Sequence, residues 1–122
     1  MNRKAFVVSL NRKAEYQGLL GGIPRTCGMR SGRVYLKSGE SCGLHSTKQN
    51  EETLVFLEGQ GEVFIGEDTC FKVASGQICY IPPHTEHNVK NAGDGPFVYI
   101  YCVAPVENCH TEGVKRPENG KI

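Results

Sequence analysis

The chain has 122 residues, and its 14 Lys and Arg side chains nearly balance 13 Asp and Glu side chains to give a formal net charge of +1. This length fits one domain, and the near-neutral charge predicts that neither nucleic acid nor an anionic membrane surface is a partner. No apolar run approaches the ~20 residues that cross a bilayer, and the apolar stretch at residues 5–10 is shorter than the core of a signal peptide, so we expect a cytoplasmic protein.

The first 30 residues are predicted to form a partly irregular N-terminal segment. Residues 19–32 contain four glycines and one proline, which interrupt any regular pattern. The segment also carries apolar side chains, among them Phe6, Leu10 and Tyr16. We therefore expect it to cover either the rest of the domain or a partner chain.

Alternating apolar and polar residues between tight turns predict that residues 31–104 are all-β. Gly59-Gln60-Gly61 supplies one short connection, and residues 91–96 form a longer turn before the last strand. Many short strands with such punctuation favour a sandwich or a barrel. Residues 105–122 are predicted to form a polar C-terminal tail. The strands are predicted at residues 32–37, 53–57, 61–65, 70–74, 77–82 and 97–103.

The strand at residues 53–57 is apolar on both faces. If Glu52 points into the domain, strand alternation sends Leu54 and Phe56 inward with it and turns Val55 and Leu57 outward. An outward apolar face needs a second covering surface. The flank of the other sheet, a partner subunit or the N-terminal segment could supply it, and we favour the partner subunit.

A first stretch of the chain has a spacing typical of one half of a metal pocket. Gly39 lies six positions before His45, Glu52 lies seven after it, and Gly59 lies a further seven on. The glycines are predicted to occupy turn positions that need unusual backbone angles. His45 and Glu52 supply an imidazole nitrogen and a carboxylate oxygen, which suit a divalent ion.

A second stretch reads as the other half of the pocket. Gly76 lies six positions before Pro82, His87 lies five after it, and Asn91 lies a further four on. Asn91 is predicted to hold a turn through side-chain hydrogen bonds rather than to touch a ligand.

Together the two stretches resemble the cupin superfamily, whose motifs are G-x5-H-x-H-x4-E-x6-G and G-x5-P-x-G-x2-H-x3-N. The resemblance covers residues 31–104, and the two departures from the motifs are Thr47 in place of the second histidine and His84 in place of glycine. It implies a single-domain cupin β-barrel, which is a double-stranded β-helix of jelly-roll type. Cupins often form dimers, so the resemblance also favours a homodimer.

By position, the resemblance makes His45, Glu52 and His87 the ligands of a divalent transition metal such as Fe, Mn, Ni or Zn. Two imidazoles and one carboxylate suit such an ion and leave coordination positions open. Thr47 lies two residues after His45, so on a strand both side chains share a face. Thr47 is therefore either a weak ligand or a group that surrounds the ligands, and Gln49, on the same alternation, is a further weak ligand candidate.

Other side chains are candidates for the pocket itself. His84 is a candidate acid or base because its ordinary pKa lies near neutrality, although an exposed turn residue is an equally good interpretation. The position of His84 is predicted to need a positive φ angle, which glycine takes readily and histidine takes less readily. The aromatic residues predicted to line the wall are Phe56, Tyr80, Tyr99 and Tyr101.

The resemblance implies two functional hypotheses. The first is a metal-dependent enzyme, either a dioxygenase, an isomerase or a lyase, that acts on a small polar metabolite such as a sugar or an organic acid. The second is a non-catalytic small-molecule-binding or sensor cupin, with or without a metal. The sequence names neither the substrate nor the reaction, because one scaffold hosts many activities.

Six cysteines, at positions 27, 42, 70, 79, 102 and 109, include no C-x-x-C pair. Without an export signal they are predicted to stay reduced. Cys79 and Cys102 are predicted to be small buried side chains within strands. Cys42 lies three residues before His45, which makes it the thiol to examine near the pocket.

Overall fold

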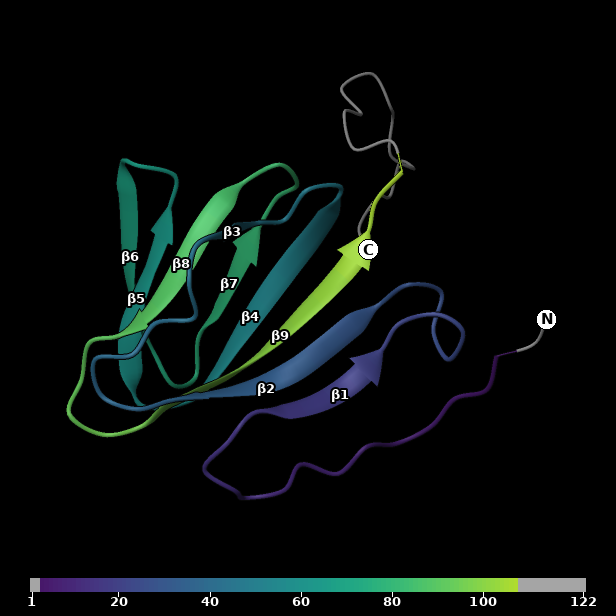
Figure 1. Cartoon of the computed structure of the whole chain (residues 1–122), viewed down its shortest axis with the longest axis horizontal. Coiled ribbons are helices and arrows are strands. Elements are labelled where there is room, and N and C mark those ends of the chain that lie inside the picture. Colours follow the sequence, from purple (N-terminus) through teal and green to yellow (C-terminus); the bar gives the residue numbers. More distant parts are fainter. Residues whose placement is uncertain (1–2, 108–122) are drawn as a thin grey trace, which may run out of the picture.

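The computed structural model describes residues 3–107, which form two antiparallel sheets (Figure 1). The five-stranded sheet has the order β1 (Gln17–Gly21), β2 (Arg30–Leu36), β9 (Phe97–Pro105), β4 (Asn50–Glu58) and β7 (Ile78–Ile81). The four-stranded sheet has the order β3 (His45–Ser46), β8 (Glu86–Asn91), β5 (Gln60–Ile65) and β6 (Thr69–Ala74). The predicted all-β class is confirmed. Within the described residues no helix could span a membrane.

Each of the six predicted strands is present within residues 3–107, although their ends differ by up to three residues. Three further strands, β1, β3 and β8, were missed. In β8 the inward positions are taken by His87, Val89 and Asn91, so two polar residues occupy the face where the alternation rule expects apolar ones. In β1 two glycines and a register shift between Gly18 and Leu20 hide the strand pattern.

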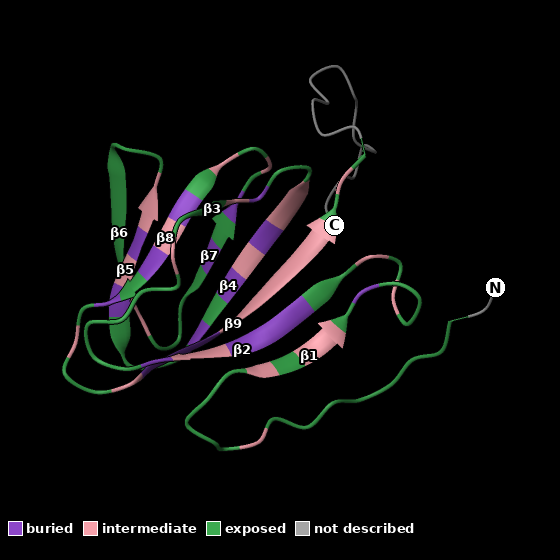
Figure 2. Cartoon of the chain, viewed as in Figure 1, coloured by how far each residue is buried: buried purple, intermediate pink, exposed green. Residues whose placement is uncertain are grey.

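The core lies between the two sheets, and buried residues lie on strands of both (Figure 2). In β4 the side chains of Glu52, Leu54 and Phe56 are buried, whereas Val55 and Leu57 are exposed, which confirms the predicted alternation. Phe56, Phe97 and Tyr99 pack their rings with centroids 5.5 to 5.9 Å apart. The inward face of β4 thus runs from a carboxylate at one end to an aromatic cluster at the other.

The turns that close the two motifs have the predicted backbone. Gly39, Gly59 and Gly76 have φ angles of 83°, 86° and 91°, in the left-handed region that glycine tolerates. Asn91 is 1% exposed, and its amide donates to the carbonyls of Leu36 and Gly95, while its oxygen accepts from Gly93 N. The prediction that Asn91 holds a turn is confirmed.

The described part of the N-terminal segment is fixed to the outer face of β2 by Arg33. The side chain of Arg33 is 5% exposed, and its guanidinium donates to the backbone oxygens of Asn11, Lys13 and Glu15 and to Asn11 Oδ1. The segment then leads to Tyr16, whose hydroxyl lies 2.7 Å from that of Tyr101. Arg33 thus holds the N-terminal segment in place. The segment runs beside β1, at the edge of the five-stranded sheet (Figure 1).

Replacing Arg33 with methionine is expected to release this segment. The substitution keeps the apolar stem but removes four charge-assisted hydrogen bonds, so we expect a loss of about 1–3 kcal/mol in the free energy of unfolding. Amide hydrogen exchange of residues 3–16 should become faster, as measured by mass spectrometry. Arg12→Met, at an exposed position, is the matched control, and equal exchange in both variants would contradict the assignment.

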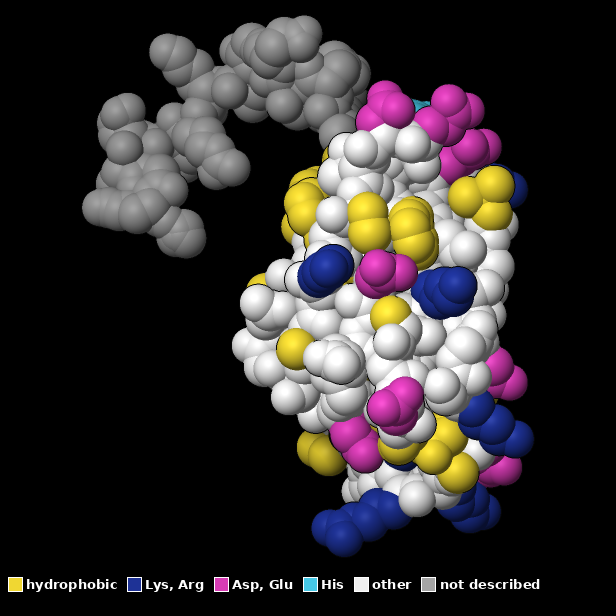
Figure 3. Space-filling model, turned by 90° about the vertical axis from the view of Figure 1, so that its left-hand side faces the viewer, with side chains coloured by type: hydrophobic (Ala, Val, Ile, Leu, Met, Phe, Trp, Pro, Cys, Tyr) yellow, Lys and Arg dark blue, Asp and Glu magenta, His cyan; other side chains and the backbone are white. Residues whose placement is uncertain are grey.

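Part of the outer surface stays open. Val55 and Leu57 are exposed, as are Ile78 and Tyr80 on β7, which are 66% and 56% exposed. Seen from the side of β6, hydrophobic side chains lie on the surface among charged ones (Figure 3). The N-terminal segment therefore covers only part of the outer face, and the homodimer stays a prediction.

The cysteines of the described region, at positions 27, 42, 70, 79 and 102, are free thiols. Cys79 is buried and Cys102 is partly buried, in line with their predicted positions in strands. Cys109 and most of the predicted C-terminal tail lie outside the described residues.

Candidate metal centre

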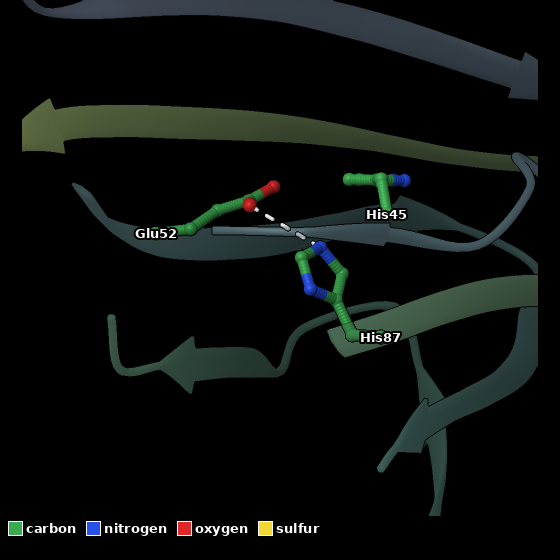
Figure 4. A group of neighbouring side chains, drawn as sticks. All are labelled: His45, Glu52 and His87. Atoms are coloured by element: carbon green, nitrogen blue, oxygen red, sulfur yellow. Dashed lines mark ion pairs between the residues drawn. The ribbon is translucent and has the colours of Figure 1, made fainter. Parts of the chain in front are cut away.

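Three strands bring His45, Glu52 and His87 together (Figure 4). His45 opens β3 and pairs with His87 on β8, while Glu52 comes from β4 in the opposite sheet. One ligand atom from each residue lies within 4.8 Å of the other two. Glu52 and His87 are 6% and 1% exposed, whereas His45 is exposed at the cavity rim. The grouping expected from the two motifs is therefore present in space.

Backbone carbonyls orient both imidazoles. His45 Nδ1 lies 2.9 Å from the Gly43 oxygen, and His87 Nδ1 lies 3.1 Å from the Thr85 oxygen. A carbonyl only accepts, so each Nδ1 carries the proton and each Nε2 presents a lone pair. This is how metal-binding histidines are usually held, with the second ring nitrogen fixed by a hydrogen bond.

The arrangement leaves a buried atom that needs a cation. His87 Nε2 lies 3.3 Å from Glu52 Oε1, and in the neutral ring it is buried without a hydrogen-bond partner. A lone pair facing a carboxylate in a buried site is repulsive unless a proton or a metal ion lies between them. Burial lowers the pKa of His87, but the Glu52 carboxylate and the Thr85 carbonyl raise it by more, so the net pKa is raised. The donor set and this unpaired nitrogen therefore fit a divalent transition metal.

The three residues line a cavity of about 270 Å³. Two further candidates, Tyr99 and Tyr101, line it as well. Burial, followed by the Cys42 thiol, raises the pKa of Tyr99. Burial and the Tyr16 hydroxyl raise the pKa of Tyr101 to about 12. Both phenols therefore stay protonated at neutral pH and can donate hydrogen bonds within the cavity.

Two aromatic candidates lie elsewhere, so their predicted place in the wall is wrong. Phe56 is 1% exposed within the aromatic core cluster and does not line this cavity. Tyr80 points to the outer face of β7, where its hydroxyl donates to Glu51 Oε1 at 2.8 Å. Tyr80 sits between the inward residues Cys79 and Ile81, so strand alternation requires it to face outward.

The Thr47 side chain lines the cavity, but its hydroxyl is used by the backbone. Thr47 Oγ1 donates to the Pro82 oxygen at 2.7 Å and accepts from Thr85 N at 3.0 Å, and the residue is 4% exposed. Both partners belong to the second motif. The hydroxyl therefore links the two motif loops, which leaves it poorly placed to bind a metal.

Thr47→Val should distinguish a structural role of the Thr47 hydroxyl from a role as a metal ligand. Valine keeps the shape but leaves the partly buried Thr85 N–H without its Thr47 partner, so we expect a loss of about 1–3 kcal/mol in the free energy of unfolding. Metal stoichiometry should stay unchanged. Urea unfolding and elemental analysis are the two measurements, and loss of metal with unchanged stability would identify Thr47 as a ligand instead.

Gln49 and His84 are exposed and lie outside this cavity, along a separate open depression that also includes Lys48 and Glu86. His84 has a φ of 56°, so the positive φ expected at this position is confirmed. Its backbone N–H donates to the Lys48 oxygen at 2.8 Å. His84 is thus a turn residue, and neither side chain is placed to act at the metal cluster.

The cavity also includes residues that sequence reasoning did not assign to the pocket, namely Arg30, Val34, Ser46, Asn50, Leu54, Val89 and Val103. Cys42, noted for its place near His45, lines the cavity too, and its thiol lies 3.5 Å from Asn88 Oδ1. Alternation could have found Arg30, because it stands two positions before Gly32 and four before Val34 on the same face of β2. The predicted strand began too late to include it.

A cupin domain model matches residues 32–103, the region that contains both motifs and all three clustered ligand candidates. The chain belongs to the cupin family. Its two sheets form the double-stranded β-helix barrel that the motifs predicted.

Solved structures agree with this fold. A Bacillus halodurans protein has a TM-score of 0.73 at 24% identity, covering 85% of this cupin and 83% of that chain. The cupin domain of Schizosaccharomyces pombe Cnp3 has a TM-score of 0.69 at 22% identity, covering 92% of this cupin and 80% of that chain. At such low identity these likenesses show the fold alone.

One curated protein is similar in sequence. An uncharacterized protein of Methanocaldococcus jannaschii is 34% identical over 67 residues, which is 55% of this cupin and 53% of the archaeal protein. The match thus spans about half of each chain.

Proposed function

We propose that this cupin is a metal-dependent enzyme in which His45, Glu52 and His87 hold one divalent transition metal and the cavity receives a small polar metabolite. The observation that carries the proposal is the buried contact between His87 Nε2 and Glu52 Oε1, with a ligand atom of His45 nearby. A protein that buries two acceptor atoms side by side gains stability from a cation between them.

Three protein ligands leave coordination positions open, at which a bound metal polarises a substrate oxygen. The chain's own residues orient the ligands and shape the space. Gly43 and Thr85 carbonyls fix the two imidazoles, and the protonated Tyr99 and Tyr101 hydroxyls supply hydrogen-bond donors on the cavity wall. Dioxygenase, isomerase and lyase reactions all use such a site, and Fe, Mn, Ni and Zn all suit this donor set.

Elemental analysis of the purified protein tests the proposal. We expect about one transition metal ion per chain, removed by a chelator and absent from His45→Ala. His84→Ala is the matched control, because it changes a histidine outside the cavity and should keep the metal. Wild-type protein that binds none of Fe, Mn, Ni or Zn when titrated with each ion would overturn the proposal.

One observation favours the second candidate, a non-catalytic binding or sensor cupin. Thr47 stands where the motif has a further histidine, and its hydroxyl is occupied by backbone groups. The site therefore has one strong ligand fewer than the full motif supplies. A metal-free protein that binds a metabolite without converting it would support this candidate.

A further inference from the structure

We propose that the cavity recognises a small organic acid, whose carboxylate pairs with Arg30 while a second oxygen group faces the cluster of His45, Glu52 and His87. This inference rests on the proposed metal-dependent function and deepens it, because it names the chemical class of the ligand and a residue that selects it. Arg30 is the first residue of β2 and lines the same cavity as the cluster.

The strand register places Arg30 and Glu52 in one row. Arg30 pairs with Val103 on β9, and Val103 pairs with Glu52 on β4. All three residues line the cavity, so their side chains point to the same face. Paired residues on neighbouring antiparallel strands have Cα atoms about 5 Å apart, so the Arg30 and Glu52 backbones lie about 10 Å apart across the row. The row therefore sets Arg30 and Glu52 on opposite sides of Val103, with all three facing the same cavity.

A backbone contact and the cavity lining place the Arg30 side chain. Its stem lies against Gly22, where an added Cβ atom would lie 3.2 Å from Arg30 Cγ and 3.5 Å from Cδ. Its charge lowers the pKa of Tyr101, against the larger effects of burial and of Tyr16 that raise it. Arg30 and Tyr101 both line the cavity, so the two side chains lie on the same side of the sheet.

Arg30 has no acidic partner in the described part of the chain. The ion pair recorded within residues 3–107 joins His87 to Glu52, and no hydrogen bond occupies the Arg30 guanidinium there. Arg33, three residues on, differs because it is buried and donates to four oxygens of the N-terminal segment. Arg33 serves the fold, whereas Arg30 presents an unused bidentate donor at the rim.

Charge and size point to the same ligand class. The cavity wall carries one cation, Arg30, and one carboxylate, Glu52, so a bound divalent metal gives it a net positive charge that favours an anion. The cavity volume of about 270 Å³ is below the range typical of pockets that bind drug-sized ligands, which favours a compact acid. A planar guanidinium matches a planar carboxylate through two parallel hydrogen bonds.

Isothermal titration calorimetry on the metal-loaded full chain tests the inference. The probes are malonate and succinate, the uncharged malonamide and succinamide, and inorganic phosphate. We expect at least one dicarboxylate to bind and its diamide not to bind. Arg30→Gln should weaken carboxylate binding roughly 10- to 100-fold, with part of the affinity kept in Arg30→Lys.

The control is Arg12→Gln, which changes the net charge equally but lies exposed on the outer face, and it should bind like wild type. Metal affinity, measured first, should be the same in all these variants. A wild-type protein that binds no metal overturns the proposed function and the inference with it. Metal binding with no carboxylate binding, or equal carboxylate binding in Arg30→Gln and Arg12→Gln, overturns the inference alone. Phosphate binding tighter than either dicarboxylate overturns the carboxylate assignment.

Discussion

His87→Ala is expected to lower the affinity for a divalent transition metal by more than about 100-fold, beyond the 10- to 100-fold typical of changes outside the ligand set. His87 is 1% exposed, and its Nε2 is the buried atom without a hydrogen-bond partner. Removing the imidazole also leaves Glu52 buried beside a cavity, so we expect the metal-free variant to lose about 3 kcal/mol in the free energy of unfolding.

Metal titration and urea unfolding measure the two effects of His87→Ala. Lys90→Ala, at an exposed position on β8, is a control that keeps all three ligand candidates. A metal affinity equal to that of wild type would show that the ion is held elsewhere.

Phe56→Ala is expected to lower the free energy of unfolding by about 3–5 kcal/mol. Phe56 is 1% exposed and packs on Phe97 with nearly parallel rings. Such a loss is a large share of the roughly 5–15 kcal/mol that stabilises a typical domain. Denaturant unfolding monitored by circular dichroism measures it.

Tyr80→Ala is the comparison for Phe56→Ala, because Tyr80 was assigned to the same wall from sequence but lies 56% exposed on the outer face. We expect it to cost less than about 1.5 kcal/mol, since little apolar surface is lost. A Phe56→Ala protein of wild-type stability that fails to bind a cavity ligand would restore Phe56 to the pocket.

Sequence reasoning succeeded where residue type and spacing carried the information. His45, Glu52 and His87 were singled out from two motifs, and the structure brings them within bonding reach of a common point. Alternation also placed the inward and outward side chains of β4 correctly. These inferences need only the period of a strand and the chemistry of the side chains.

Sequence reasoning failed where the position of a residue along the length of the barrel mattered. Phe56 and Glu52 share a face of β4, but Phe56 lies toward the end filled by aromatic rings and Glu52 toward the cavity. Alternation gives the face of a residue and not its depth. Arg30 was missed because the predicted strand began at Gly32, and its place beside the cluster depends further on the pairing of β2 with β9 and of β9 with β4.

The contact between the hydroxyls of Tyr16 and Tyr101 has a practical consequence for anyone who trims this protein. The cupin match starts at residue 32, so Tyr16 lies outside the matched residues. Its hydroxyl nevertheless contacts that of Tyr101, which lines the cavity. A chain shortened to the matched residues would keep every metal ligand candidate and lose Arg30, β1 and this tyrosine pair together. Such a fragment is therefore a poor substitute for the full chain in any search for its natural ligand.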